Sequence, residues 1–592
     1  MKRNILYYLA IAAFLISYSA SAQNLDPTVE VTRDYEGKLL VAHKPILDMA
    51  VPDSVYRFDL DFDYSVTDTP YKGAYEFVPY SVDMSLEPKR RDENVLYLKA
   101  GAGYQLHPTA DLVWSPAFKG PFSLDVYGRT RSFWGNYWTM SSPDYANDEI
   151  GLVDNDSSKG TWYGMDWNSS AGVSGRYDWN NSVFLFGLDY TNFYQSQKED
   201  IYGLRARLFN SAGVNLSLAA KDPLAAGLDY KVALKYKYSD DLLNDQTNGQ
   251  TGLQSHDLGF GVDIESVLSG GHNLKINSSF DMTDENGVLD VTAAALEFAP
   301  RYVIKGSRWI LEAGLRLSTV FKTDGKSSMY SHKEQVIYPD LRAEYMIFPE
   351  FLKTYATVGG GNKMNTYSSL VAENRRVNPY YGRGVWNLLD MTEERLAAEL
   401  GFEGRVFSYF GYTLKGGYKI YGNAPLQTLY IYDSDSGYMP GLGYTSYQMA
   451  YASMDFLLDT ESVRVDGNVQ FNGVTSVDHT FDSLVGFVFP APFKGDIAVM
   501  YDYNDRLYAG VDCEFSSARE GRAYRKMGER NPREYKITVP AYADLGINLE
   551  YRFRHDMSFW ARGGNFLGMT IQRELLYAEK GPYFTVGICL NL

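Results

Sequence analysis

Aspartates recur at every second position in one early stretch of the chain, and oxygen-rich clusters of this kind can bind calcium. Asp59, Asp61 and Asp63 alternate with aromatic and aliphatic residues, which predicts three carboxylates on one face of an extended segment. Neighbours on that face would lie about 6.6 Å apart, whereas a calcium loop needs a tight turn to bring its oxygens together. A solvated strand edge is therefore the better interpretation.

A second acidic cluster lies in one polar stretch and is a better candidate for calcium, although an ordinary acidic surface loop explains it more simply; its members are Asp144, Asp148, Glu149, Asp154 and Asp156. The seven histidines are scattered and form no pair at helical metal-ligand spacing. The sequence also has no nucleophile elbow and no glycine-rich phosphate loop. We therefore predict no catalytic, cofactor-binding or metal-binding residues, and a protein that is not an enzyme.

Aromatic side chains gather between residues 134 and 179 and could stack on a glycan. Anchoring at the membrane interface explains these aromatic residues more simply, because tryptophan and tyrosine concentrate at membrane–water boundaries. Both readings stay open for the five tryptophans Trp134, Trp138, Trp162, Trp167 and Trp179.

The elements that would position these residues are strands with a strict two-residue period. The last ten residues, Tyr583 to Leu592, place small or polar residues on one face and apolar residues on the other. The apolar face is the part that we expect the barrel-assembly machinery to recognise, and it comprises Phe584, Val586, Ile588, Leu590 and Leu592.

The same alternation recurs along the chain, in the stretches 228–237, 309–318, 410–420, 463–471 and 544–553. The polar faces carry charges of both signs. A soluble sandwich would turn them to bulk water, whereas a transmembrane barrel turns them to a wet lumen and the apolar face to lipid. Aromatic richness, with 49 Tyr, 31 Phe and 9 Trp, favours the barrel.

Connections alternate in length, as they do in outer-membrane barrels. Short ones include Asn504-Asp505, His555-Asp556, Lys305-Gly306 and Thr460-Glu461, and long polar ones fall near 136–160, 240–252, 363–391, 433–442, 474–489, 519–540 and 568–582. With strands beginning near Val95, we predict an all-β fold, a transmembrane antiparallel barrel of about 22 strands, with 20 and 24 also open.

The N-terminus resembles a secretory signal over residues 1–22. Lys2 and Arg3 precede an apolar stretch, and Ala20-Ser21-Ala22 form a small-residue cleavage site before Gln23. No later segment approaches the roughly 18 apolar residues of a membrane-spanning helix. A net charge of −17 argues against nucleic-acid binding, and two cysteines cannot supply a disulfide framework.

The final hundred residues contain a series of short motifs: Pro490-Ala491-Pro492-Phe493-Lys494, Arg506 to Gly510, Val539 to Gly546, Tyr551-Arg552-Phe553, Gly563-Gly564-Asn565-Phe566-Leu567, Tyr577 to Pro582 and Phe584 to Gly587. In these motifs the chain resembles the TonB-dependent receptor family, the gated importers of Gram-negative outer membranes. Family members usually end on an aromatic residue, whereas this chain ends on Leu592.

The N-terminal part departs from that family. Its members carry a plug domain inside the barrel, after a short TonB-contacting box. Here only residues 23–93 precede the predicted barrel of 94–592, so the plug is reduced or absent. A box-like hexapeptide is present, although an extended leader explains it equally well: Thr28, Val29, Glu30, Val31, Thr32 and Arg33.

A barrel of about 22 strands would have a lumen radius of roughly 17 Å, and a compact segment of about 70 residues would fill only about half of it. Inward-folded loops, the periplasmic or lumenal N-terminal segment or a partner protein must close the rest. The resemblance implies gated import across the cell outer membrane, with ligand capture by extracellular loops. A non-transporting scaffold or assembly barrel, closed by loops or a partner, and a passive porin are alternatives. Candidate partners are outer-membrane lipid, the barrel-assembly machinery, and TonB or an outer-membrane lipoprotein.

Overall fold

A computed structural model describes residues 95–592, except 139–143, 147–148, 152–160, 197–203, 222–226, 246–248, 269, 288–289, 325–331, 350, 378–389, 432–437, 478–484 and 526–532. The predicted signal peptide, the segment 23–93 and the hexapeptide Thr28 to Arg33 lie outside the described residues. Among the residues described, no helix is long and apolar enough to cross a membrane.

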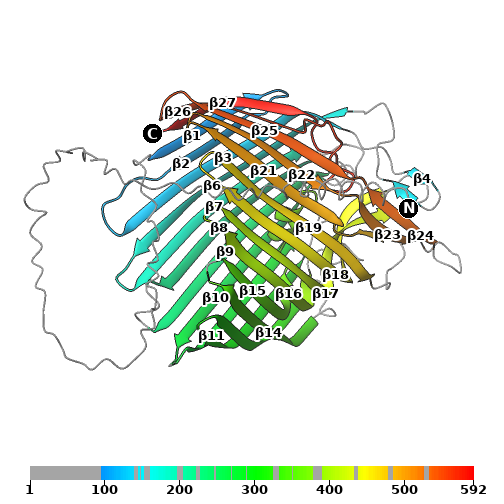
Figure 1. Cartoon of the computed structure of the whole chain (residues 1–592). Coiled ribbons are helices and arrows are strands. Elements are labelled where there is room, and N and C mark those ends of the chain that lie inside the picture. The colour runs from blue at the N-terminus through cyan, green and yellow to red at the C-terminus, as the bar shows by residue number, and fades with distance from the viewer. Residues whose placement is uncertain are drawn as a thin grey trace, which may run out of the picture. The chain divides into compact units, whose positions relative to one another are not determined.

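The described chain forms one antiparallel barrel whose wall contains 22 strands, as predicted (Figure 1). The first half of the wall consists of β1 (Leu96–Gly103), β2 (Thr109–Trp114), β3 (Phe122–Trp138), β6 (Thr161–Asp178), β7 (Ser182–Ser196), β8 (Leu204–Ala220), β9 (Leu228–Asp245), β10 (Gly249–Val267), β11 (His272–Gly287), β12 (Val291–Lys305) and β13 (Trp309–Asp324).

The second half of the wall consists of β14 (His332–Phe348), β15 (Leu352–Met364), β16 (Met391–Val406), β17 (Phe410–Ile431), β18 (Tyr438–Asp459), β19 (Val463–Val477), β21 (Phe493–Tyr503), β22 (Leu507–Ser516), β25 (Tyr542–Arg552), β26 (Met557–Gly564) and β27 (Tyr583–Asn591). Each wall strand pairs with the next, and β27 pairs with β1 from Tyr97↔Asn591 to Gly103↔Thr585, which closes the cylinder. Closure leaves no free edge in the wall.

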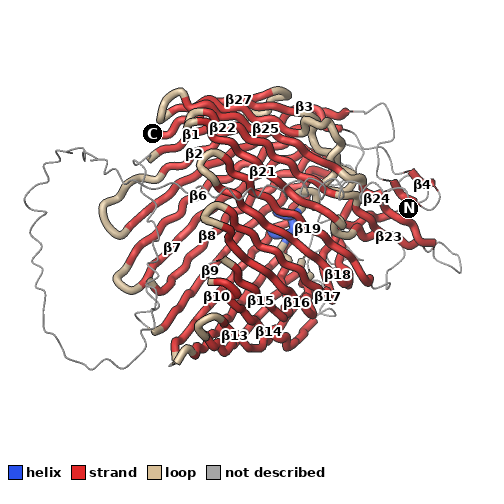
Figure 2. The backbone as a smooth tube through the Cα atoms, viewed as in Figure 1, coloured by secondary structure: helices blue, strands red, loops and turns tan. Residues whose placement is uncertain are grey.

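Five short strands lie in the connections rather than in the wall: β4 (Asp144–Ala146), β5 (Glu149–Gly151), β20 (Val485–Val488), β23 (Arg519–Arg525) and β24 (Arg533–Val539). Within the described chain the only helix is α3 (Tyr367–Glu373), which follows β15 and is drawn in blue in Figure 2. The stretch predicted as a loop at 519–540 is thus largely the β23–β24 hairpin.

The two ends of the barrel differ, as the connection lengths predicted. One end, the short-turn end, carries tight turns such as 306–308, 460–462 and 504–506. The other, the long-loop end, carries the long connections 365–390, 517–541 and 565–582. One predicted loop is wrong: β9 and β10 stay paired up to Asp245↔Gly249, so 240–252 is mostly strand. Its polar residues stay in the ladder because inward-facing Asp241 has a buried cationic partner there.

The wall alternates between an apolar outer face and a polar inner face. On β13 the outward residues Trp309, Leu311, Leu315 and Leu317 are between 41% and 53% exposed, whereas inward Ser318 is 1% exposed. On β27 the same holds for the predicted apolar face, in which Phe584, Val586 and Ile588 are between 45% and 53% exposed. An apolar belt that surrounds a closed barrel is what a lipid environment requires.

Candidate functional site

Three segments meet at the mouth of the barrel, at the long-loop end. The first is residues 365–377, which contain α3. Thr366 caps this helix by accepting a hydrogen bond from the Ser369 N–H at 3.3 Å. A helix of seven residues is unstable by itself, so tertiary packing must hold it. Leu370 and Val371, each 1% exposed, pack against wall residues Phe193, Phe209 and Leu253.

A buried ion pair anchors this helix to the wall. Arg207 on β8 contacts Asp241 on β9 through two nitrogens, with Nη2 at 2.6 Å from Oδ2 and Nε at 3.1 Å from Oδ1. Tyr367 of α3 completes the group, because Arg207 Nη2 lies 2.8 Å from its hydroxyl and that hydroxyl also bonds the Asp241 carboxylate. Burial raises the pKa of Tyr367 well above its ordinary value, so the hydroxyl keeps its proton.

Two carboxylates from the wall support the helix from the neighbouring strands. Ser368 Oγ donates to Asp257 on β10 at 2.6 Å, and the Tyr367 N–H donates to Glu285 on β11 at 3.3 Å. Thr283 Oγ1 also donates to Asp257, at 2.6 Å. The start of α3 is therefore bound to four consecutive wall strands, β8 to β11.

The second inward segment is residues 565–582, between β26 and β27. Asn565 begins it in a left-handed conformation, φ 49°, which asparagine tolerates better than most residues. Its side chain bonds both the N–H and the carbonyl of Met569, at 3.1 and 3.0 Å. The Gly563-Gly564-Asn565 sequence that supported the family resemblance thus shapes this segment.

Arg573 holds the middle of the second segment against the wall. Its guanidinium lies 2.8 Å from Glu514 on β22 and 3.1 Å from Asp544 on β25. It also lies 2.6 Å from Glu579 of its own segment. A planar guanidinium can serve three carboxylates at once, which lysine cannot do with comparable geometry.

The inward segments also contact one another. Arg376 of the first segment lies 3.5 Å from Glu574 of the second, and the Arg375 N–H donates to Glu574 at 3.2 Å. The third segment, formed by β20, β23 and β24, contacts the second through a buried apolar cluster of Leu429, Val488, Ile537, Val539 and Leu575. Among the described residues, the segments at the mouth are therefore connected through side chains rather than lying as separate loops.

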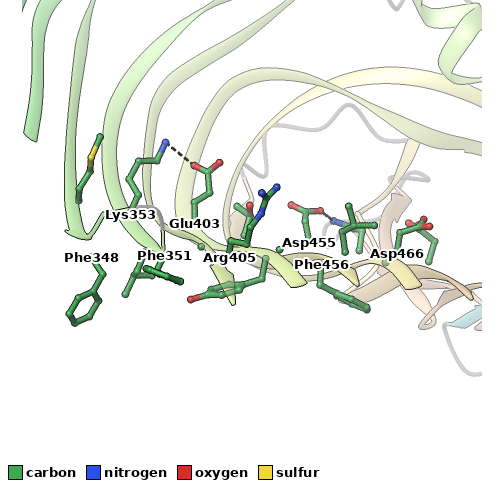
Figure 3. A pocket seen from close by; sticks show the side chains of 18 residues that line it. Phe348, Phe351, Lys353, Glu403, Arg405, Asp455, Phe456 and Asp466 are labelled. Carbon is green, nitrogen blue, oxygen red and sulfur yellow. Dashed lines mark hydrogen bonds and ion pairs between the residues drawn. The ribbon is translucent and has the colours of Figure 1, made fainter. Parts of the chain in front are cut away.

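A different cavity, of about 700 Å³, lies at the short-turn end (Figure 3). Its lining consists of wall strands and their short turns, without side chains from several long segments that meet at one point. Charged side chains such as Lys353 and Glu403, paired at 2.9 Å, lie on one side of the strands there, and Phe348 and Phe456 lie on the other. This is the inside–outside alternation of the wall itself. We therefore place the candidate site at the long-loop mouth.

The residues singled out from the sequence have different positions. Trp134 and Trp167 lie 6.3 Å apart on neighbouring strands, whereas Trp162 stacks on the buried Tyr137. The described residues contain no group of three or more potential metal ligands. Asp59, Asp61, Asp63, Asp148, Asp154 and Asp156 lie outside the described part of the chain.

Arg207, Asp241, Tyr367 and Arg573 were missed by the sequence analysis. Alternation shows that Arg207 and Asp241 face inward, but their pairing depends on the register of β8 against β9. Tyr367 and Arg573 lie on long loops, and no local pattern tells whether a loop folds inward.

Comparisons with known proteins agree with this architecture. No protein-family model and no curated protein sequence matches the chain. Among solved structures, the copper transporter OprC superposes with a TM-score of 0.59 at 10% identity, covering 84% of this chain and 80% of that one. The ferric enterobactin receptor PfeA of Pseudomonas aeruginosa gives 0.58 at 11% identity, again over 84% and 80%.

The chain has the fold of TonB-dependent receptors. The siderophore receptor PirA of Acinetobacter baumannii gives a TM-score of 0.56 at 10% identity, over 84% of this chain and 80% of that one. At such identity the likeness concerns the fold and carries no information about the side chains of the mouth.

Proposed function

We propose that this protein is an outer-membrane transport protein of TonB-dependent receptor type, whose mouth is closed by its own inward-folded loops. Support comes from the 22-strand closed barrel with its apolar belt and from the fold shared with known receptors. The observation that carries the proposal is the connected contact set between 365–377 and 565–582. In this scheme the long-loop end faces the exterior, and ligand capture loosens these contacts.

The N-terminal segment supplies the energised step in the proposal. Residues 28–33 contact TonB, and residues 23–93 gate passage in place of a full plug. The test is photocross-linking in living cells from a reactive amino acid at position 29, with position 90 as a control outside the hexapeptide. A cross-link to TonB from position 29 alone supports energised import. Its absence from both positions, in a barrel present in the outer membrane, rejects that mechanism.

A scaffold or assembly barrel is the second candidate, favoured by how firmly the loops are anchored. Tyr367 of α3 bonds the Arg207–Asp241 pair, whose side chains are 1% and 0% exposed, and so deeply buried a contact is unusual for a helix that must leave the wall often. Purification from mild detergent discriminates between the two. A stoichiometric outer-membrane lipoprotein supports the scaffold, and copurification with TonB alone supports the transporter.

A further inference from the structure

A second cavity, of about 330 Å³, lies on the inner side of the wall where the first strands meet the last. Its walls come from β1 to β3, β6, β26 and β27, together with Arg375 and Lys580 of the two inward segments. Five cationic side chains and two carboxylates line it: Lys99, Arg131, Arg375, Arg562 and Lys580, with Asp111 and Asp166. The cavity is thus basic within a chain of net charge −17.

Some of these cations are already neutralised and others are not. Arg131 lies 2.6 Å from Asp111, which compensates its charge. Arg562 has no ion-pair partner among the residues that the structure describes, although it faces inward beside Trp560 on β26. An uncompensated guanidinium on a half-enclosed wall attracts an anion more strongly than one in bulk water does.

Lys580 is the second available cation, because its nearest polar partner is neutral. Its Nζ lies 2.7 Å from His107 Nε2, and His107 Nδ1 lies 3.2 Å from the Thr585 hydroxyl. Lysine can only donate, so Nε2 must accept and the imidazole carries its proton on Nδ1. Burial, together with Lys580, lowers the pKa of His107 to about 4. The positive charge of Lys580 therefore remains available at neutral pH.

Two buried polar atoms of the cavity lack a partner among the described residues: the indole Nε1 of Trp560 and Asp166 Oδ1. The ring of Trp560 lies flat on two glycines, since a Cβ at Gly101 or Gly587 would come within 2.5 or 2.7 Å of it. The wall thus makes room for an indole that donates no hydrogen bond within the protein. Asp166 itself lines the cavity, and its carboxylate can accept a hydrogen bond from a ligand hydroxyl through the other oxygen, Oδ2.

The aromatic faces of the cavity are already covered. Lys580 Nζ lies 4.0 Å above the Tyr583 ring, and His107 stacks on the same ring at 4.9 Å. Lys99 covers Trp560 at 4.6 Å. A sugar or aromatic ligand would need an open ring face for stacking, so these contacts favour a small flexible anion. The volume holds about ten water-sized groups.

We propose that this cavity is a binding site for a small hydroxylated organic dicarboxylate, with its carboxylates on Arg562 and Lys580 and a hydroxyl on Asp166. The inference goes beyond the transport function, because the site binds its ligand whether or not the barrel carries it across the membrane.

The test uses the full mature chain in detergent, at low ionic strength, with D-glucarate as the probe and calorimetry as the readout. Sorbitol is the matched neutral compound, because it has the same carbon skeleton with hydroxyls in place of the carboxylates. We expect saturable binding of glucarate and none of sorbitol. Arg562→Gln should weaken glucarate binding about tenfold, or about 1.4 kcal/mol.

Arg405→Gln is the control variant. Arg405 also faces the inner side of the wall and is exposed, but it lies near the short-turn end (Figure 3). Its substitution should change glucarate affinity less than twofold. Equal losses of glucarate affinity in Arg562→Gln and Arg405→Gln would show that glucarate responds to the overall electrostatic potential of the lumen rather than to a defined site. That result would overturn the proposal. Equal binding of sorbitol, or no saturable binding of glucarate, would overturn it as well.

Discussion

In the proposed closure, the contact that most directly holds α3 against the wall is the Tyr367 hydroxyl between Arg207 and Asp241, and Tyr367→Phe removes it without changing the ring. The hydroxyl bonds two charged groups, and such hydrogen bonds contribute about 1.5–3 kcal/mol each. Arg207 and Asp241 keep each other as partners, with Nη2 and Oδ2 at 2.6 Å, so part of that energy is retained. We expect a net loss of about 2 kcal/mol, which raises the undocked fraction of α3 about 30-fold.

The assay is thiol labelling of Val371→Cys by a polar maleimide. Val371 is 1% exposed and packs against the wall, so a cysteine there reacts only when α3 leaves it. The native thiols, Cys513 and Cys589, are first replaced by alanine. Where redocking is faster than labelling, the rate follows the undocked fraction. Tyr367→Phe should then speed labelling about 30-fold.

Tyr345→Phe is the matched control, since Tyr345 lies on the outer face of β14 and is 49% exposed. It should leave the labelling rate of Val371→Cys unchanged. If Tyr367→Phe and Tyr345→Phe gave the same rate as the parent, the buried hydroxyl would not hold the helix, and the proposed closure would lose its principal anchor.

Three further outcomes follow from the same structure. Asn565→Ala should destabilise the protein by about 2 kcal/mol, because alanine loses the side-chain bonds to Met569 and tolerates φ 49° poorly; Asn565→Gly should cost less, as read from denaturant midpoints. Leu315→Arg on the outer face of β13 should destabilise the folded barrel in lipid by about 2–4 kcal/mol, measured by unfolding from vesicles, and an unchanged midpoint would place this face away from lipid. Burial lowers the pKa of Lys580 to about 8. The glucarate affinity measured by calorimetry should therefore fall as the pH rises through about 8, because the ammonium group then loses its proton. The Lys580→Gln variant should show no such fall.

The wall of the barrel could be predicted from the sequence because, within each strand, the alternation of apolar and polar residues shows which side chains face outward and which face the lumen. The two-residue period of 309–318 or 583–592 predicts both a strand and its apolar face, without knowledge of any partner. Short turns such as Asn504-Asp505 mark strand ends in the same local way, and both residues have positive φ there. The strand number follows from counting such units.

The contacts at the mouth could not be predicted because they join residues far apart in the chain. Tyr367 meets Asp241 across 126 positions, and Lys580 meets His107 across 473. Polar loops such as 565–582 have the same composition whether they extend into solvent or fold inward. The error at 240–252 has a related cause, since its polar residues resemble a loop until the partner of Asp241 is known.

Single-channel conductance in planar bilayers tests the central claim most directly, with the full mature chain compared with a variant that lacks residues 366–377. The account predicts that the full chain stays closed and that the variant opens a large, steady conductance. A full chain that conducts as freely as the variant, or a variant that stays as closed as the full chain, would contradict the claim that these inward-folded loops close the barrel.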